Sequence, residues 1–203
     1  MSEFQRQGPL DGYSLQQRAV ESLADAGVQV GLAEIRYEGA LNLRARRDDP
    51  AAREALSKAL GRPLPATTKL EAKEDCVVLG LGPDEWLFLC PDPKASAASL
   101  AAELSAVFVA VTDTSDNYVT LVVSGPRARD LLAKGVPIDL HESAFPPASC
   151  AQTLLSKAEV LLYRGPDAED DRITLLCRPS FAQYVFTWLK DAAQEYGLAI
   201  LTG

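Results

Sequence analysis

Short apolar runs and helically spaced apolar residues follow one another along the chain, and their order predicts alternating strands and helices from residue 34 onward. Apolar runs bounded by glycine and proline are typical of buried strands. The predicted strands are 76–81, 86–89, 119–123, 159–163 and 173–177. Residues 34–46 alternate in polarity, and Gly39 within them is expected to form a bend, a bulge or a tight hairpin.

Helical spacing of apolar residues predicts helices between these strands. The predicted helices are 50–60, 95–107, 126–134 and 180–196. A proline opens the first and the third, and Asp49 and Ser124 are expected to cap them, since a short polar side chain can accept a bond from a free N–H group. Gly135 follows the third helix and is expected to end it in the left-handed conformation.

The two halves of the chain repeat one order of elements, which is strand, helix, strand, turn, strand, helix. The turn 82–84 (Gly-Pro-Asp) in the first half corresponds to the turn 165–167 in the second, and Cys90 and Cys177 each end the strand that follows. The repeat predicts an α+β fold of duplicated βαββα (ferredoxin-like) halves, with antiparallel sheets and helices packed on them.

The domain organisation follows from this repeat. We expect a single α+β domain over residues 34–203, because each half is too small to bury a core by itself. Its two pseudo-repeats are expected at about 34–108 and 109–203. Residues 1–33 are predicted to be an N-terminal arm with one short helix, since apolar residues recur at helical spacing until Gly27. Such an arm can serve a partner or be a loose tail.

Charge and composition exclude several classes of protein. The chain has 203 residues, is 47% hydrophobic and carries a net charge of −8, so a nucleic-acid surface with clustered cations is not expected. The densest basic run, 44–47, is followed at once by Asp48 and Asp49. No apolar stretch is long enough to cross a membrane, and the polar N-terminus does not resemble a signal peptide. A cytoplasmic protein is therefore predicted.

Chemistry-bearing residues are sparse. The four cysteines are far apart in sequence, which argues against zinc and redox-pair spacing, and they are expected to be small buried hydrophobes. His141 is the single histidine, so a hydrolase of the Ser–His–Asp or Cys–His kind would have to use it. The glycines at 80 and 82 precede a proline turn instead of a helix, unlike a phosphate loop. No catalytic, cofactor-binding or metal-binding residue is predicted.

Three aromatic residues near the C-terminus share one helical face. Phe181, Tyr184 and Trp188 recur at spacings of three and four. Such a set can pack the core, or it can form a ridge for a partner, because Trp and Tyr are enriched at the centres of interfaces. We keep these three residues as candidate interface residues.

Several short sequence motifs, in a specific order, resemble one family. They are DTSD (113–116), SGPRA (124–128), LAKGVPIDL (132–140), FP (145–146), CAQT (150–153) and RPSFA (178–182), followed by Trp188-Leu189. The chain resembles the gamma subunit of heterotetrameric sarcosine oxidase, strongly over about 109–197 and loosely before that, through DEWL at 84–87. The pattern is also similar to the folate-binding fold of the glycine-cleavage aminomethyltransferase and its iron–sulfur-assembly relatives. Val136 stands where those last relatives carry a cysteine, which counts against an assembly-factor role.

The resemblance implies a non-catalytic structural subunit of a complex that oxidatively demethylates sarcosine to glycine. Its partners would be the alpha, beta and delta subunits. The resemblance further implies that FAD, FMN, NAD and folate lie on those partners and none on this chain. It also implies that the chain docks on the alpha subunit through an apolar patch too large for a monomer.

Two alternatives remain open at the level of sequence. The first is a free-standing folate-binding or aminomethyltransferase-like protein, which would need a central cavity with a carboxylate such as Asp113 or Asp116. The second is an autonomous hydrolase that uses His141.

Overall fold

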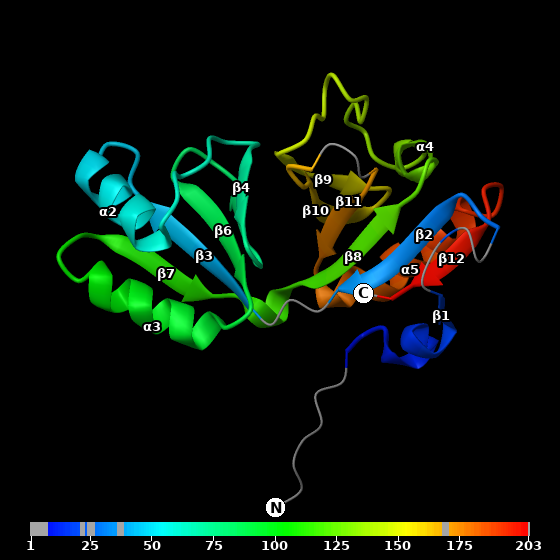
Figure 1. The fold of residues 1–203 in the computed structure, drawn as a ribbon, viewed down its shortest axis with the longest axis horizontal. Helices are drawn as coiled ribbons and strands as arrows, with labels where there is room; N and C mark the ends of the chain where they lie inside the picture. The colour runs from blue at the N-terminus through cyan, green and yellow to red at the C-terminus, as the bar shows by residue number, and fades with distance from the viewer. Residues whose placement is uncertain (1–7, 21–22, 24–26, 36–38, 168–170, 203) are drawn as a thin grey trace, which may run out of the picture.

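Two sheets, each with helices on one face, stand side by side as two lobes (Figure 1). The computed structural model describes residues 8–20, 23, 27–35, 39–167 and 171–202. The predicted α+β class with antiparallel sheets is confirmed. None of the helices in these ranges is long and apolar enough to cross a membrane.

The first lobe contains an antiparallel sheet of five strands in the order β4-β5-β6-β3-β7. The strands are β3 (Gly39–Ala45), β4 (Leu70–Lys73), β5 (Cys76–Gly80), β6 (Glu85–Cys90) and β7 (Val109–Asp113). Helices α2 (Pro50–Leu60) and α3 (Pro93–Glu103) cover one face, where alternate strand residues such as Leu43 and Trp86 are buried against them. The predicted Asp49 cap is confirmed, because its Oδ1 accepts a bond of 2.9 Å from the Ala52 N–H.

The second lobe contains seven strands in the order β1-β12-β2-β8-β11-β10-β9. The strands are β1 (Ala19–Val20), β2 (Val30–Ile35), β8 (Val119–Ser124), β9 (Ser149–Leu155), β10 (Ala158–Arg164), β11 (Ile173–Cys177) and β12 (Leu198–Leu201). Helices α4 (Ala128–Ala133) and α5 (Pro179–Ala192) cover one face, and a short 3-10 helix η3 (Ser115–Asn117) precedes β8. Both β1 and β2 pair parallel to β12, while the other strands pair antiparallel.

From β3 onward both lobes have the element order strand, helix, three strands, helix, strand. The predicted βαββα order is therefore incomplete in each half, because β4, β7, β9 and β12 were not predicted. The two sheets also differ, since β2 lies between β8 and β12, whereas β3 pairs directly with β7. The alternating segment 34–46 is not one hairpin, because β2 and β3 belong to different sheets.

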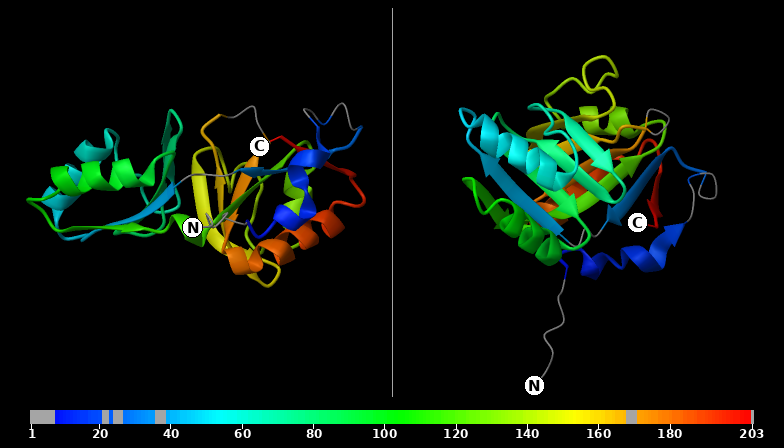
Figure 2. Two further views of the ribbon diagram at one scale, coloured as in Figure 1. Left: turned by 90° about the horizontal axis from the view of Figure 1, so that it is seen from below. Right: turned by 60° about the vertical axis from the view of Figure 1, so that its left-hand side comes forward.

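The helix-free faces of the two sheets meet in a shared apolar cluster, with the helices on the outer sides (Figure 2). The buried residues of this cluster are Ala40, Leu70, Leu79, Leu87, Leu89, Cys150, Leu161, Tyr163 and Leu176. Two backbone bonds also join the edge strands β4 and β9, from Leu70 N–H to the Ala148 carbonyl (3.2 Å) and from Cys150 N–H to the Thr68 carbonyl (2.9 Å). The seam between the lobes thus consists of a buried apolar cluster and of backbone hydrogen bonds between two edge strands.

The N-terminal segment is packed on the second lobe. Short 3-10 helices η1 (Asp11–Tyr13) and η2 (Leu15–Arg18) precede β1, and the part of the predicted helix at 21–22 and 24–26 lies outside the described residues. The Tyr13 ring lies 4.5 Å from that of Phe186 on α5, and Leu15 is buried in the core. Strand β2 crosses the predicted boundary at residue 33, because its buried residues pair with β8.

The prediction for the start and end of α4 was wrong at both ends. Ser124 is the last residue of β8, and Arg127 precedes the helix without a side-chain cap. Gly135 does not take a left-handed conformation. Instead it makes room for the Trp188 ring, because a Cβ on Gly135 would lie 2.4 Å from Cζ2 of that ring.

Candidate functional site

The three aromatic residues predicted as an interface have different surroundings on α5. Phe181 and Trp188 are half-buried against the core beneath the second sheet. Only Tyr184 is exposed, at 39%, and its hydroxyl donates to the Ser156 Oγ at 3.0 Å. The three residues therefore do not form a continuous exposed ridge, and their role in an interface stays a prediction.

The single histidine lies in an exposed loop between α4 and β9. Its Nδ1 is 2.8 Å from the Ser143 hydroxyl, and its backbone N–H donates to Asp139 Oδ1. All these partners are within two residues of His141, so the bonds shape a turn. Ser143 lies within hydrogen-bond reach of the ring, but among the described residues no third side chain bonds to Nε2 and orients it, as a catalytic nucleophile–base pair requires.

The cysteines are free and mostly buried. Burial raises the pKa of the Cys150 thiol to about 11 and that of Cys177 to about 12. These thiols are therefore protonated at neutral pH, which disfavours nucleophilic or ligand roles. Among the described residues, no group of three or more His, Cys, Asp or Glu side chains is placed to hold a metal ion.

The two acidic residues considered for a pterin lie at the crossover between the lobes. Asp113 ends β7, where its Oδ1 accepts bonds from the backbone and hydroxyl of Ser115. Asp116 is exposed within η3. Neither lines the groove described next.

A groove of about 400 Å³ opens at the seam, beside the shared apolar cluster. Its apolar lining comes from Leu154 on β9, Leu161 on β10, Leu176 on β11 and Leu81 after β5. These leucines share one face of the sheet because side chains alternate along a strand, so that every second residue faces the other lobe. The volume is at the lower end of that of small-ligand sites.

Polar residues surround this apolar floor. Glu159, Gln152 and Arg178 are exposed, and the Gln152 amide donates to the Leu81 carbonyl at 3.3 Å, which ties the two walls together. Burial raises the pKa of the Tyr118 hydroxyl, and the nearby Arg178 cation opposes that rise. The groove thus has an apolar base and a rim of mixed charge, a composition found both at protein interfaces and in small-ligand sites.

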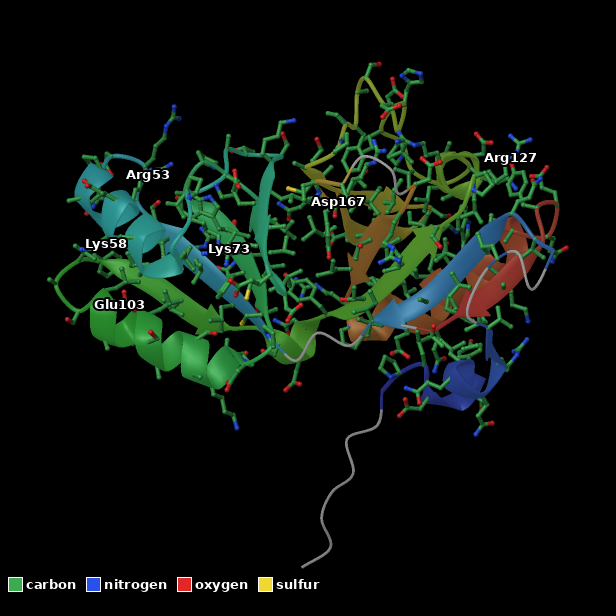
Figure 3. The ribbon with its side chains drawn as sticks, viewed as in Figure 1. Arg53, Lys58, Lys73, Glu103, Arg127 and Asp167 are labelled. Carbon is green, nitrogen blue, oxygen red and sulfur yellow. The ribbon has the colours of Figure 1, made fainter. Side chains whose placement is uncertain are left out.

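Two exposed apolar side chains lie near this groove, whereas the most exposed one lies in the first lobe, just before β7. Among the described residues, three large hydrophobic side chains are exposed: Phe108 (76%), Leu154 (43%) and Tyr184 (39%). Leu154 lines the groove, and Tyr184 is bonded to Ser156, two residues further along the chain. The labelled charged residues Arg53 and Lys58 lie instead on the outer helix α2 (Figure 3).

Sequence reasoning missed the residues of this groove. It found CAQT at 150–153 as part of a family resemblance, but the weak alternation of 149–155 did not predict a strand. The signal was weak, since the stretch 149–155 is uncharged but Ser156-Lys157, which follows it, is not one of the pairs typical of a two-residue hairpin turn.

Comparison with known proteins places the chain among sarcosine oxidase subunits. The model of the sarcosine oxidase, gamma subunit family matches residues 44–195. The sarcosine oxidase subunit gamma of an Arthrobacter species is 34% identical over 92% of this chain and 94% of its own. That of Corynebacterium sp. (strain U-96) is 33% identical over 89% of this chain and 88% of its own.

Solved structures agree. A chain of the heterotetrameric sarcosine oxidase from Corynebacterium sp. U-96, solved in complex with pyrrole 2-carboxylate, is 30% identical, with a TM-score of 0.80 over 94% of this chain and 96% of its own. The glycine cleavage system aminomethyltransferase T from Bartonella henselae shares the fold, with a TM-score of 0.62 at 13% identity over 93% of this chain and 50% of that one. The family resemblance read from the sequence is confirmed: the chain belongs to the sarcosine oxidase gamma subunit family.

Proposed function

We propose that this chain is the gamma subunit of a heterotetrameric sarcosine oxidase and that it acts as a structural, non-catalytic subunit. The observation that carries the proposal is the 30% identical structural match to a chain of such a complex, at a TM-score of 0.80. The protonated buried thiols and the loop position of His141 support the non-catalytic part.

The proposal includes the partners and the cofactors. The chain would assemble with alpha, beta and delta subunits, docking on the alpha subunit, and FAD, FMN, NAD and folate would be bound by those partners. A cytoplasmic location stays a prediction that accompanies this assignment.

Co-expression with the candidate partner subunits tests the proposal. The chain should co-purify with them in a stoichiometric complex that oxidises sarcosine, and the isolated chain should carry no flavin absorbance. If the partners assemble and turn over sarcosine at the full rate without the chain, and it never co-purifies with them, the proposal fails.

A folate-binding role is the second candidate, because the chain is 28% identical to an aminomethyltransferase of Saccharopolyspora erythraea over 83% of its length, or 48% of that protein. The seam groove is the place to consider, yet Asp113 and Asp116 do not line it. Saturable micromolar binding of tetrahydrofolate by the isolated chain would favour this role, and its absence would favour the structural one.

We also infer that the two lobes derive from one duplicated unit. The shared order of strands and helices from β3 to β7 and from β8 to β12 supports this, with β1 and β2 as additions to the second sheet. Superposition of the two lobes on each other is the direct test.

A further inference from the structure

The outer edge of strand β9 is paired at both ends and open in the middle. Near its start, Ala148 and Cys150 bond to Leu70 and Thr68 of the first lobe. Just beyond its end, the Ser156 N–H donates to the Gly135 carbonyl at 2.8 Å. In an antiparallel strand, every second residue directs its N–H and C=O groups away from the neighbouring strand. Cys150 directs its groups away from β10, so those of Gln152 and Leu154 also point outward.

These middle groups have no partner within the described chain. No backbone or side-chain hydrogen bond reaches the N–H or C=O groups of Gln152 or Leu154 from another strand or loop. Edge strands with unpaired groups readily accept another strand, and proteins usually protect them with Lys, Pro or a bulge. Strand β9 contains no charged residue and no proline, and its pairing with β10 is continuous from Ser149 to Leu155.

The open edge lies beside the seam groove. The side chains of Gln152 and Leu154 line that groove, and Leu154 is 43% exposed. On the other face of the sheet, Tyr184 reaches the β9–β10 turn through its bond to Ser156. Free backbone groups, an apolar hollow and two exposed apolar side chains therefore occur at one corner of the molecule.

We propose that residues 152–154 of β9 form a docking edge for a short extended segment of a partner subunit. This rests on the proposed function and names the surface that it uses. The chain itself demonstrates the geometry, because residues 68–70 already pair antiparallel with 148–150 along the same edge. The residues that precede Thr68 do not bond to the next positions of β9. The partner segment would pair there instead, with residues 152 and 154.

The chemistry of the partner segment follows from the groove. Residues opposite Gln152 and Leu154 in an antiparallel pair point to the same face as those side chains, so two partner side chains at positions i and i+2 enter the groove. Its floor of leucines selects apolar side chains there. Glu159 and Arg178 at the rim favour a cation and an anion, respectively, beside them.

A second copy of this chain is a less suitable occupant. Each copy carries a net charge of −8, so two copies repel each other, whereas a larger partner can supply complementary charge. Pairing of β9 with itself would still be possible by geometry, and the experiment below separates the two cases.

Binding of full-length variants to the co-purified partner subunits tests the docking edge. Leu154→Lys places a charge in the groove at an exposed position and should weaken binding by about thirty-fold or more, as removal of an interface hot spot does. Phe108→Lys is the matched control, because Phe108 is likewise an exposed apolar residue. It lies just before β7, the edge strand of the other sheet. This variant should change binding by no more than about two-fold.

Amide hydrogen exchange gives a readout that does not depend on a variant. The amides of Gln152 and Leu154 should become protected when the complex forms and should exchange fast in the isolated chain. Normal binding by Leu154→Lys, or unprotected amides in the complex, overturns the docking edge and leaves the proposed function standing. Protection that appears in a homodimer of the isolated chain overturns the choice of partner, and failure to bind any partner overturns the proposed function itself.

Discussion

The contact between Gly135 and Trp188 predicts that a single methyl group destabilises the second lobe. In Gly135→Ala the new Cβ would lie 2.4 Å from Cζ2 and 2.7 Å from Cη2 of the ring. Ordinary contact begins near 3.4 Å, so the ring must move by about 1 Å inside a packed layer. Such overpacking costs about 1–3 kcal/mol.

The unfolded state reduces this cost. Replacing glycine by alanine removes about 0.4–1 kcal/mol of unfolded-state entropy where the backbone permits it, and Gly135 has no left-handed φ. The net loss in the free energy of unfolding is therefore about 1–2 kcal/mol. For a chain of this size that lowers the melting temperature by about 2–8 °C.

Thermal and urea unfolding of four proteins measures the effect: the unsubstituted chain, Gly135→Ala, Trp188→Leu and the double variant. With the ring removed, Gly135→Ala should become neutral or stabilising, which gives a coupling energy of at least about 1 kcal/mol. Gly165→Ala is the control, since nothing lies within 4 Å of its Cβ position, and it should change stability by about 0.5 kcal/mol or less. An equal loss in both backgrounds would refute the steric reasoning.

The remaining predictions concern charge, thiols and a helix cap. The Glu195 carboxylate accepts a hydrogen bond from Lys134, which lowers its pKa, so its stabilising effect is present above the pKa of an unfolded glutamate and is lost as the pH falls through the folded value. In an NMR titration Lys134→Met should return the Glu195 pKa toward its ordinary value, and an unmoved pKa would contradict this cause. The Cys150 and Cys177 thiols should resist a thiol reagent at pH 8 in the folded chain and react in denaturant, because burial keeps them protonated; fast reaction when folded would contradict their burial. Asp49→Ala should cost about 1 kcal/mol in urea unfolding through the lost cap of α2, whereas Asp49→Asn should cost little; equal losses would point to the charge instead of the cap.

Features with strong local signals were predictable from the sequence. Strand β11 (Ile173–Cys177) and helix α2 (Pro50–Leu60) have their predicted bounds, and the Asp49 cap forms as expected. An uninterrupted apolar run or a proline after a capping residue specifies its structure within a few residues. The family could also be identified from the sequence, because its motifs are short segments in a fixed order.

The candidate site was predictable only in part. Tyr184 is exposed as an interface residue should be, but helical spacing could not distinguish it from Phe181 and Trp188, which turn toward the core. The sequence did not single out residues 152 and 154, because their unpaired backbone N–H and C=O groups depend on how the neighbouring strands pair.

The sequence by itself therefore determined the α+β class, the strands and helices with strong local signals, and the family. The tertiary structure alone decided that β2 and β3 belong to different sheets, that Gly135 accommodates a ring 53 residues away and that β9 keeps an open edge. The physical reason is range: propensity and capping act within a few residues, whereas strand partners and buried faces depend on the free energy of contacts between distant segments.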